Sequence, residues 1–260
     1  MPALVRLYPF VLLLLALSAC GGNERRTSNG PLVLAAISLQ NVLTDAADEW
    51  ERRGNARPLL AFSGTPAVVR MAESGAPGDL LITADEDWMD RAEEAEVVRS
   101  ASRVDLASNR LVLIAPSDAL LPADPLEPGR LAAMLGSTAR IAMADPASVP
   151  AGRYGRTALE RLGIWSAVEN AVVPADSVRG ALRLVATGEA RFGVVYATDA
   201  AMEPGVAVVA TFPRDSHPPI RYPLALLAAS SHPDAGAFRD FLLSRDGEAL
   251  LRKRGFVAQP

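Results

Sequence analysis

The sequence predicts an α/β fold built around parallel β-sheets, and two observations support this class. From Pro31 onward, short β-branched or apolar runs alternate with longer amphipathic stretches, which is the pattern of βαβ units. The chain has 260 residues, 50% of them hydrophobic, which suffices for one large or two medium domains with cores of their own. Proline and glycine are spread along the chain, so no long segment is predicted to be disordered.

The alternating runs give the expected elements in chain order. The expected strands are Leu32–Ala36, Leu59–Phe62, Asp79–Thr83, Arg110–Ala115, Arg140–Ala144, Phe192–Tyr196, Val206–Thr211 and Tyr222–Ala228. The expected helices are Leu39–Arg53, Pro66–Ser74, Glu86–Ala95, Pro128–Leu135, Ala151–Leu162, Ser177–Thr187, Asp234–Leu243 and Arg245–Arg254. In the first helix, apolar residues from Val42 to Trp50 recur with a period of 3.6 residues, so we assign this stripe to the core. We expect Trp88 to be a packing residue for the same reason.

The N-terminus has the features of an export signal. The run Val11–Ala19 is too short to span a membrane, and Arg6 is the only charged residue before it. The run leads into the sequence LSAC, which resembles the bacterial lipoprotein signal, whose cysteine becomes the lipidated first residue of the mature chain. We expect residues 1–20 to form a lipoprotein signal peptide lipidated at Cys20, and residues 21–30 to form a flexible tether. An ordinary signal peptide that contains a cysteine is the alternative.

Charge and composition argue against a nucleic-acid partner. The net charge is −4, aromatic residues make up 5% of the chain, and no basic stripe follows any expected helix. The net negative charge also bears on small ligands. An anion would have to be held by local donors, because the charge of the whole protein does not attract it.

The sequence lacks a recognisable catalytic set. His217 and His232 are the only histidines, and neither has a second histidine or a cysteine at metal-ligand spacing, which argues against a zinc site. There is no G-x-S-x-G, P-loop or G-x-G-x-x-G motif, and Lys253, the only lysine, lies in a charged C-terminal helix. Asp85 and Asp87 could do acid–base work or could form the polar first turn of a helix. These observations indicate a binding protein rather than an enzyme.

Small or hydroxyl-bearing residues stand where the expected strands lead into helices. Ser38 follows the first strand, and Thr65 suits the N-cap of a helix whose first residue is Pro66. The segments 145–152 and 172–177 lead into later helices in the same way. Ligands of open α/β sheets bind among such turns, and a helix N-terminus favours anions through its unpaired N–H groups and its dipole. With few lysines or arginines nearby, these turns are typical of a neutral oxyanion cradle, although most capped helices bind nothing.

Seven stretches, in order, resemble the periplasmic molybdate-binding proteins, a family of the class II solute-binding fold. They are LAAISL from Leu34, GAPGDL from Gly75, TADEDWMD from Thr83, DP with VPAG from Asp145, ADSVRGAL from Ala175, GVVY with TDA from Gly193, and ATFP with DSH from Ala210. The resemblance implies two lobes, each a mostly parallel sheet flanked by helices, joined by two hinge crossings. We expect lobe 1 to comprise residues 31–106 plus 211–260, and lobe 2 residues 107–210.

The resemblance also implies that a desolvated tetrahedral oxyanion is held without a charged counter-residue. Carried over by motif, the oxyanion-binding positions are Ser38, Thr65, Ala151, Val178 and Tyr196. The implied donors are the hydroxyls of Ser38 and Tyr196, the backbone N–H groups of Ala151 and Val178, and the hydroxyl of Thr65 with its N–H. The family usually has a serine-rich run at the second turn, whereas this chain has SGTP, so Ser63 is the second candidate there.

The resemblance finally implies the biological setting. The ligand would be molybdate or tungstate, with no cofactor and no side chain bound directly to the metal. The partners would be an ABC transporter permease and its ATPase, and the chain would be an exported, extracytoplasmic monomer attached to the membrane only by its lipid. Three alternatives stay open: a binding protein for sulfate or phosphate, a sensing or adhesion lipoprotein, and an enzyme on the same scaffold, as in porphobilinogen-type deaminases. The last would need a cofactor-attaching cysteine in the body of the chain, whereas Cys20 lies in the leader.

Overall fold

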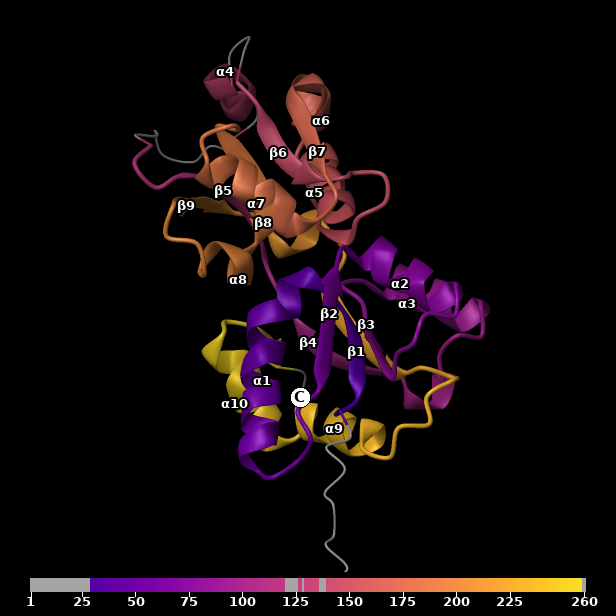
Figure 1. The fold of residues 1–260 in the computed structure, drawn as a ribbon. Helices are drawn as coiled ribbons and strands as arrows, with labels where there is room; N and C mark the ends of the chain where they lie inside the picture. Colours follow the sequence, from indigo (N-terminus) through magenta and orange to yellow (C-terminus); the bar gives the residue numbers. More distant parts are fainter. Residues whose placement is uncertain (1–28, 120–125, 128, 136–138, 259–260) are drawn as a thin grey trace, which may run out of the picture.

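The computed structural model describes residues 29–119, 126–127, 129–135 and 139–258, which form two lobes that each contain one sheet (Figure 1). The expected signal peptide, the lipidation site Cys20 and residues 21–28 of the expected tether lie outside the described residues. No helix in the described part of the chain is long and apolar enough to cross a membrane.

The lower lobe in Figure 1, lobe 1, contains a six-stranded sheet in the order β11-β4-β10-β3-β1-β2. Its strands are β1 Leu32–Ala36, β2 Leu59–Ser63, β3 Leu80–Ile82, β4 Val104–Ser108, β10 Arg221–Leu226 and β11 Val257–Ala258. Strand β1 runs parallel to β2 and β3, while β10 is antiparallel to β3 and β4. The helices of this lobe are η1 Ile37–Leu39, α1 Gln40–Arg52, α2 Thr65–Glu73, α3 Glu86–Glu94, η2 Ser100–Ser102, α9 Ala235–Leu242 and α10 Arg245–Lys253.

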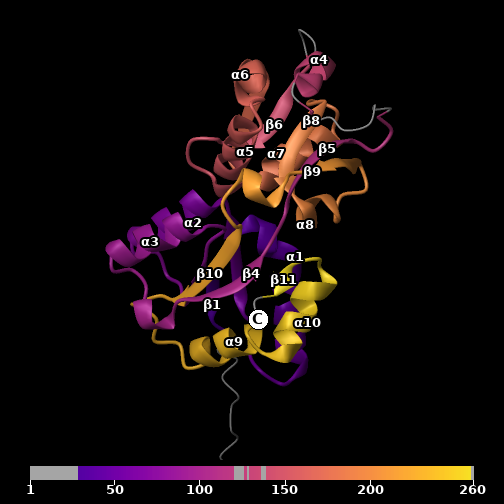
Figure 2. The same ribbon diagram turned by 180° about the vertical axis from the view of Figure 1, so that it is seen from behind.

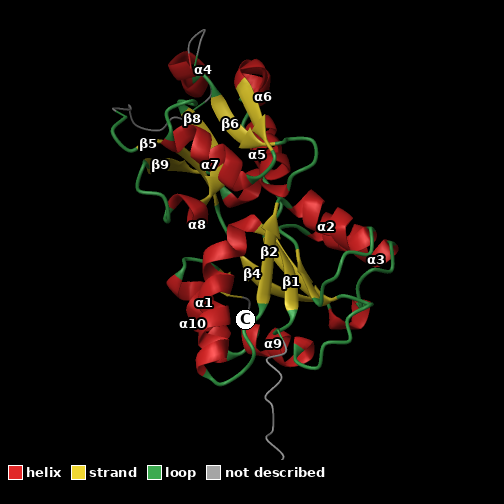
Figure 3. Cartoon of the chain, in the orientation of Figure 1, coloured by secondary structure: helices red, strands yellow, loops and turns green. Residues whose placement is uncertain are grey.

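The upper lobe, lobe 2, contains a five-stranded sheet in the order β7-β6-β8-β5-β9. Its strands are β5 Leu111–Pro116, β6 Ile141–Ala144, β7 Val172–Ala175, β8 Phe192–Tyr196 and β9 Val206–Thr211. Strand β6 is parallel to β7 and β8, and β5 is antiparallel to β8 and β9. The helices that flank this sheet (Figure 3) are α4 Arg130–Leu135, α5 Pro150–Arg161, α6 Trp165–Val168, η3 Glu169–Ala171, α7 Val178–Ala186 and α8 Ala197–Ala200.

The predicted two-lobed α/β class is confirmed, with one refinement. Each sheet is parallel on one side, in β3-β1-β2 and in β7-β6-β8. The strands that carry the chain between the lobes add antiparallel pairs on the other side, so the sheets are mixed rather than mostly parallel. The apolar stripe of the first helix, which the sequence assigns to the core, is buried as expected, whereas Trp88 is only partly buried. The apolar stripe of α1 is inaccessible, and the ring of Trp50 packs edge-on against Phe238 at 5.5 Å between ring centroids.

The chain passes between the two sheets twice, and both passages are visible from behind (Figure 2). Residues 109–110 join β4 to β5, and residues 212–220, which include η4 Arg214–Ser216, join β9 to β10. These passages lie slightly beyond the expected boundaries. Strand β4 pairs with β10 as far as Ser108, opposite Arg221, and Thr211 still pairs with Val112 in the second sheet.

Candidate functional site

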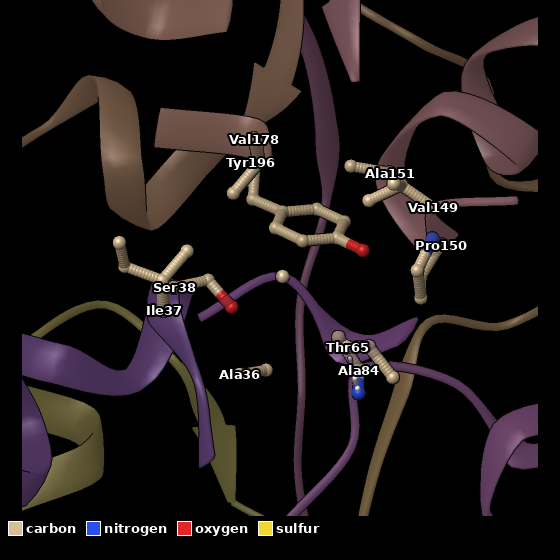
Figure 4. Close-up of a pocket in the computed structure, with 11 residues that line it drawn as sticks. Ala36, Ile37, Ser38, Thr65, Ala84, Val149, Pro150, Ala151, Val178 and Tyr196 are labelled. Atoms are coloured by element: carbon tan, nitrogen blue, oxygen red, sulfur yellow. Dashed lines mark hydrogen bonds between the residues drawn. The ribbon is translucent and has the colours of Figure 1, made fainter. Parts of the chain in front are cut away.

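A cavity lies between the lobes, at the carboxyl ends of the parallel strands of both sheets (Figure 4). It is small: the centre of a water-sized molecule has about 10 Å³ to move in, within a crevice of about 220 Å³ that includes space open to solvent. The residues that line it are Ala36, Ile37, Ser38, Gly64, Thr65, Ala84, Val149, Pro150, Ala151, Val178 and Tyr196. All five principal positions carried over from the family are in this set, and they come from both lobes. The second candidate, Ser63, is the last residue of β2 and does not line the cavity.

Ser38 lies in the 3-10 turn η1 that directly follows β1. The turn has no side-chain cap, so Ser38 is not the N-cap that its position after the strand suggests. Ser38 is 4% exposed, and its Oγ makes no hydrogen bond of ordinary geometry to a described residue, although it lies near enough to the Tyr222 hydroxyl to offset part of the rise in the pKa of that phenol. A buried hydroxyl without a partner costs about 1–3 kcal/mol, so such a group in a native site indicates a missing acceptor.

Thr65 is the first residue of α2 and not its N-cap. Gly64 takes the cap position in an extended conformation, and Pro66 follows within the first turn, where its missing N–H costs little. The Thr65 Oγ accepts a hydrogen bond of 3.2 Å from the backbone N–H of Ala84, which also lines the cavity. Because a hydroxyl both accepts and donates, the hydrogen of Thr65 stays available for a ligand.

Lobe 2 brings two helix N-termini to the cavity. Helix α5 begins at Pro150 without a side-chain cap, and Ala151 lies in its first turn. Helix α7 begins at Val178, where the Ser177 hydroxyl caps the N–H of Gly180 at 3.1 Å. First-turn N–H groups have no partner within their own helix, so those of Ala151 and Val178 can donate to a ligand. Their apolar side chains are no obstacle to this role.

Tyr196, the last residue of β8, supplies a second buried hydroxyl. It is 1% exposed, its OH has no partner within the described part of the chain, and Figure 4 shows the ring directed into the space between the lobes. Burial raises the pKa of this phenol well above its ordinary value of 10, with nearby tyrosines and acids acting in the same direction. Tyr196 therefore stays neutral at physiological pH and acts as an O–H donor.

No charged residue is among the described residues that line the cavity, although Asp85 directly follows Ala84, which does line it. Asp85 is the N-cap of α3 and accepts the N–H of Trp88 at 3.0 Å, and burial raises the pKa of its carboxyl to about 6. Asp87 lies in the first turn of α3 with its side chain 64% exposed. The pair thus forms the polar start of a helix, as one of the two interpretations predicts. Asp199 in α8 is fully buried, which raises the pKa of its carboxyl to about 7 despite the neighbouring Arg179.

Side chains from the two lobes also bond directly to each other on both flanks of the cavity. On one flank, the Trp88 Nε1–H donates to the Ser148 carbonyl at 2.9 Å, and Arg153 binds Asp85 at 3.1 Å. On the other flank, Arg179 bonds to residues of α1. The sequence assigned Trp88 to packing and singled out neither arginine. No local pattern reveals such contacts, because the partners lie 60 to 139 residues apart in the chain.

The histidines take no part in the cavity. His217 lies in the second passage between the lobes, with its Nδ1 2.7 Å from the Pro218 carbonyl oxygen, and burial lowers the pKa of its imidazole. His232 contacts the carbonyl of Asn29 through Nε2. Among the residues that the structure describes, no group of three or more His, Cys, Asp or Glu side chains could hold a metal ion.

Comparisons with known proteins agree with this geometry. A family model described as bacterial extracellular solute-binding protein matches residues 31–257. The molybdate-binding protein ModA of Escherichia coli is 36% identical over 239 residues, which cover 92% of this chain and 93% of that protein. A putative ABC transporter substrate-binding lipoprotein, YvgL of Bacillus subtilis, is 29% identical over 94% of both chains.

A solved structure supports the fold in the same way. The periplasmic molybdate-binding protein of Azotobacter vinelandii superposes with a TM-score of 0.77 at 22% identity, over 88% of this chain and 100% of that chain. These matches confirm the family resemblance seen in the seven sequence stretches. The chain belongs to the family of bacterial extracellular solute-binding proteins.

Proposed function

We propose that the chain binds molybdate, or the near-identical tungstate, between its lobes and delivers it to an ABC importer. The single observation that carries this proposal is that the Ser38 and Tyr196 hydroxyls are buried in one cavity and have no hydrogen-bond partner among the described residues. Both lack an acceptor, and a tetrahedral oxyanion supplies several acceptors at once. The ligand named for the Escherichia coli relative fits this requirement.

Five residues would hold the anion. Ser38, Thr65 and Tyr196 would donate hydroxyl hydrogens, and Ala151 and Val178 would donate first-turn N–H groups. Of the described residues in the lining, none is Asp, Glu, His, Lys or Arg. The site would therefore bind a dianion with neutral donors alone, in the manner of helix N-termini that bind phosphate.

Neutral donors suffice energetically. Each hydrogen bond to a charged group contributes about 1.5–3 kcal/mol, so the five donors give roughly 7.5–15 kcal/mol before costs. A micromolar complex needs about 8 kcal/mol. The remainder offsets the desolvation of the anion and the ordering of the site, so micromolar or tighter binding is expected.

Binding would favour the closed arrangement of the lobes. Ser38 and Thr65 belong to lobe 1, whereas Ala151, Val178 and Tyr196 belong to lobe 2. An anion that bonds to both lobes stabilises the state in which they meet, and this differential affinity is what drives a hinge. A permease could then distinguish the loaded protein from the empty one by its shape.

The location follows from the family and from the leader sequence. Because the family is extracellular, we place the chain on the extracytoplasmic side of the membrane. We infer that Cys20 carries a lipid anchor, which the LSAC sequence and the lipoprotein name of the Bacillus subtilis relative support. A Cys20→Ala variant should leave the membrane fraction, and a variant that still sediments with membranes would contradict the anchor.

Calorimetric titration of the chain without its leader tests the proposed ligand. Molybdate and tungstate should bind one per chain with micromolar or tighter affinity, and sulfate should bind more weakly. Saturable binding of sulfate or phosphate in preference to molybdate would favour the other oxyanion class. An absence of binding to all four ions would overturn the proposal.

A further inference from the structure

We propose that Arg179 is a positioning residue that holds the two lobes closed around the bound anion and so sets how slowly the anion leaves. This inference rests on the proposed function. Arg179 does not line the cavity, so it would act through the relative placement of the lobes rather than by touching the ligand.

The guanidinium of Arg179 bonds to both lobes at once. Its Nε donates to Asp199 Oδ1 in lobe 2 at 3.1 Å. Its Nη1 donates to Gln40 Oε1 at 3.0 Å, and its Nη2 donates to Asn41 Oδ1 at 2.5 Å. Gln40 and Asn41 begin α1 in lobe 1. One side chain therefore joins the start of a lobe 1 helix to the interior of lobe 2.

These bonds connect the backbone segments that carry three of the five proposed ligand contacts. Arg179 directly follows Val178, the proposed N–H donor of α7. The Gln40–Asn41 pair follows Ser38 within a few residues, and Asp199 follows Tyr196 in the same way. Movement of the guanidinium away from either partner would therefore change the distances between groups that must meet on the anion.

Opening of the lobes would keep the bond of Arg179 to Asp199 but break its bonds to Gln40 and Asn41. Arg179 and Asp199 both belong to lobe 2, so their ion pair survives when the lobes separate. Asp199 is 0% exposed and holds the guanidinium in place in advance. The bonds to Gln40 and Asn41 cross between lobes, so they exist only when the lobes meet.

Interactions present only in the closed state slow opening, and with it ligand release. The planar guanidinium suits this role because its several N–H donors point in fixed directions, which a lysine ammonium does not reproduce. The Arg179 side chain is 22% exposed, so water screens these bonds less than it screens bonds at an open surface. We therefore expect loss of Arg179 to act mainly on the dissociation rate.

The test compares Arg179→Gln with Arg183→Gln in the mature chain, using molybdate as the probe. Arg183 is exposed, one turn further along α7, and its substitution changes the net charge by the same amount. Release is followed by stopped-flow tryptophan fluorescence, since Trp88 bonds across the lobes. Arg179→Gln should release molybdate at least about tenfold faster and bind it correspondingly more weakly, while Arg183→Gln should stay within about twofold of wild type. Arg179→Lys should lie between them.

A second variant keeps the test decisive if Arg179→Gln does not fold. Asn41→Ala removes one lobe 1 acceptor and leaves the Arg179–Asp199 pair intact, so it should also accelerate release without lowering the melting temperature of the ligand-free chain. If the wild type binds molybdate and both variants release it at the wild-type rate, the positioning role of Arg179 is wrong. A wild type that binds no molybdate overturns the proposed function, and this inference with it.

Discussion

Polar groups in the cavity between the lobes and polar groups on the two flanks of the cavity differ in charge and in hydrogen bonding. In the cavity, the hydroxyls of Ser38 and Tyr196 are uncharged, buried and without partners in the described chain. On the flanks, Arg153 and Arg179 are charged and bonded to residues of the other lobe. The cavity hydroxyls therefore need a hydrogen-bond acceptor from a ligand. The arginines on the flanks instead find their partners in the other lobe when the lobes meet. The cavity residues would bind the anion and favour closure through it, and the flank residues add bonds between the lobes that do not involve the anion.

The flanks also differ from each other. Arg179 is held in place before closure by Asp199, a wholly buried carboxylate of its own lobe, so its bonds to lobe 1 need little reordering of the side chain. Arg153 has no such anchor and divides its cross-lobe bonds between the buried Asp85 and the exposed Asp87. Exposed ion pairs contribute about 0–1 kcal/mol because water and salt screen them. The Arg179 flank should thus contribute more to closure, and the substitutions below test this ordering from the largest expected effect to the smallest.

The largest effect is expected where the two lobes touch without any side chain between them. A Cβ atom on Gly64 would lie 2.4 Å from the Asp176 carbonyl oxygen of lobe 2, although the backbone of Gly64 suits an alanine. Gly64→Ala should weaken molybdate binding about 10- to 100-fold, since forced overpacking costs about 1–3 kcal/mol. The ligand-free melting temperature should change little, because the clash arises only on closure.

Gly236→Ala is the matched control for this substitution. A Cβ atom there meets no atom of the described residues within 4 Å, so binding should match that of wild type. Small-angle scattering with saturating molybdate should show Gly64→Ala more extended than wild type. Equal affinity and equal compactness would mean that the lobes do not meet at Gly64 when the anion is bound.

The next effect concerns the hydroxyls themselves. Ser38→Ala and Tyr196→Phe should each weaken molybdate binding at least roughly tenfold, about 1.4 kcal/mol, because each removes one donor to a charged ligand. Calorimetry measures the affinity, and thermal melting of the ligand-free chain verifies the fold. Neither variant should destabilise the empty protein, since each deletes a buried hydroxyl that has no partner among the described residues. Ser74→Ala, on the exposed end of α2, is the control, and unchanged affinity in both variants would remove these residues from the site.

A smaller effect should appear in the dependence of stability on pH. Burial raises the pKa of Asp85 to about 6 and that of Asp199 to about 7, both above the ordinary value of 3.8. A carboxyl whose pKa is raised by folding contributes stability at low pH, and this stability is lost as the pH rises from about 4 through the folded-state pKa. The melting temperature of the wild type should therefore fall between pH 5 and pH 8 more than that of Asp199→Asn.

His217 works in the opposite direction in this window, because burial lowers the pKa of its imidazole. Comparison of each variant with wild type at the same pH cancels that contribution. A pH profile of Asp199→Asn that parallels the wild type would show that Asp199 does not titrate with a raised pKa.

The smallest effect is expected at the exposed end of the Arg153 flank. Asp87→Asn should change the affinity and release rate of molybdate by less than about twofold, because its ion pair with Arg153 is open to water. The affinity for molybdate and its release rate by stopped-flow tryptophan fluorescence measure this effect, as for Arg179→Gln. A tenfold change would reverse the proposed order of the two flanks.

Most of the fold could be predicted from local pattern, and the strands that were missed share a physical reason. Strand β7 contains Pro174 and is an edge strand that pairs only with β6 in the described sheet. Strand β11 is two residues long, and β4 mixes Asp105 with apolar residues. Such segments become strands because a neighbouring strand is present, and that neighbour is distant in the chain. Central strands and long helices carry their own apolar period and were predicted closely.

The cavity and its surroundings show the same difference between features set by local pattern and features set by contacts between distant residues. Helix starts after strands can be recognised locally, so the sequence and the family resemblance together indicated the five positions that meet in it. The local geometry was less predictable: Gly64 and not Thr65 caps α2, because the helix begins one residue earlier than the proline suggests. The flanks could not be predicted at all. Arg179 and Asn41 are 138 residues apart, and only the folded chain brings them within hydrogen-bond distance.

The most direct test is a crystal structure of the mature chain with molybdate, in which anomalous scattering locates the molybdenum. We predict one peak between the lobes, with the oxyanion within hydrogen-bond distance of the Ser38 and Tyr196 hydroxyls and of the N–H groups of Ala151 and Val178. A peak elsewhere on the protein, or these four donors turned away from the anion, would contradict the proposal.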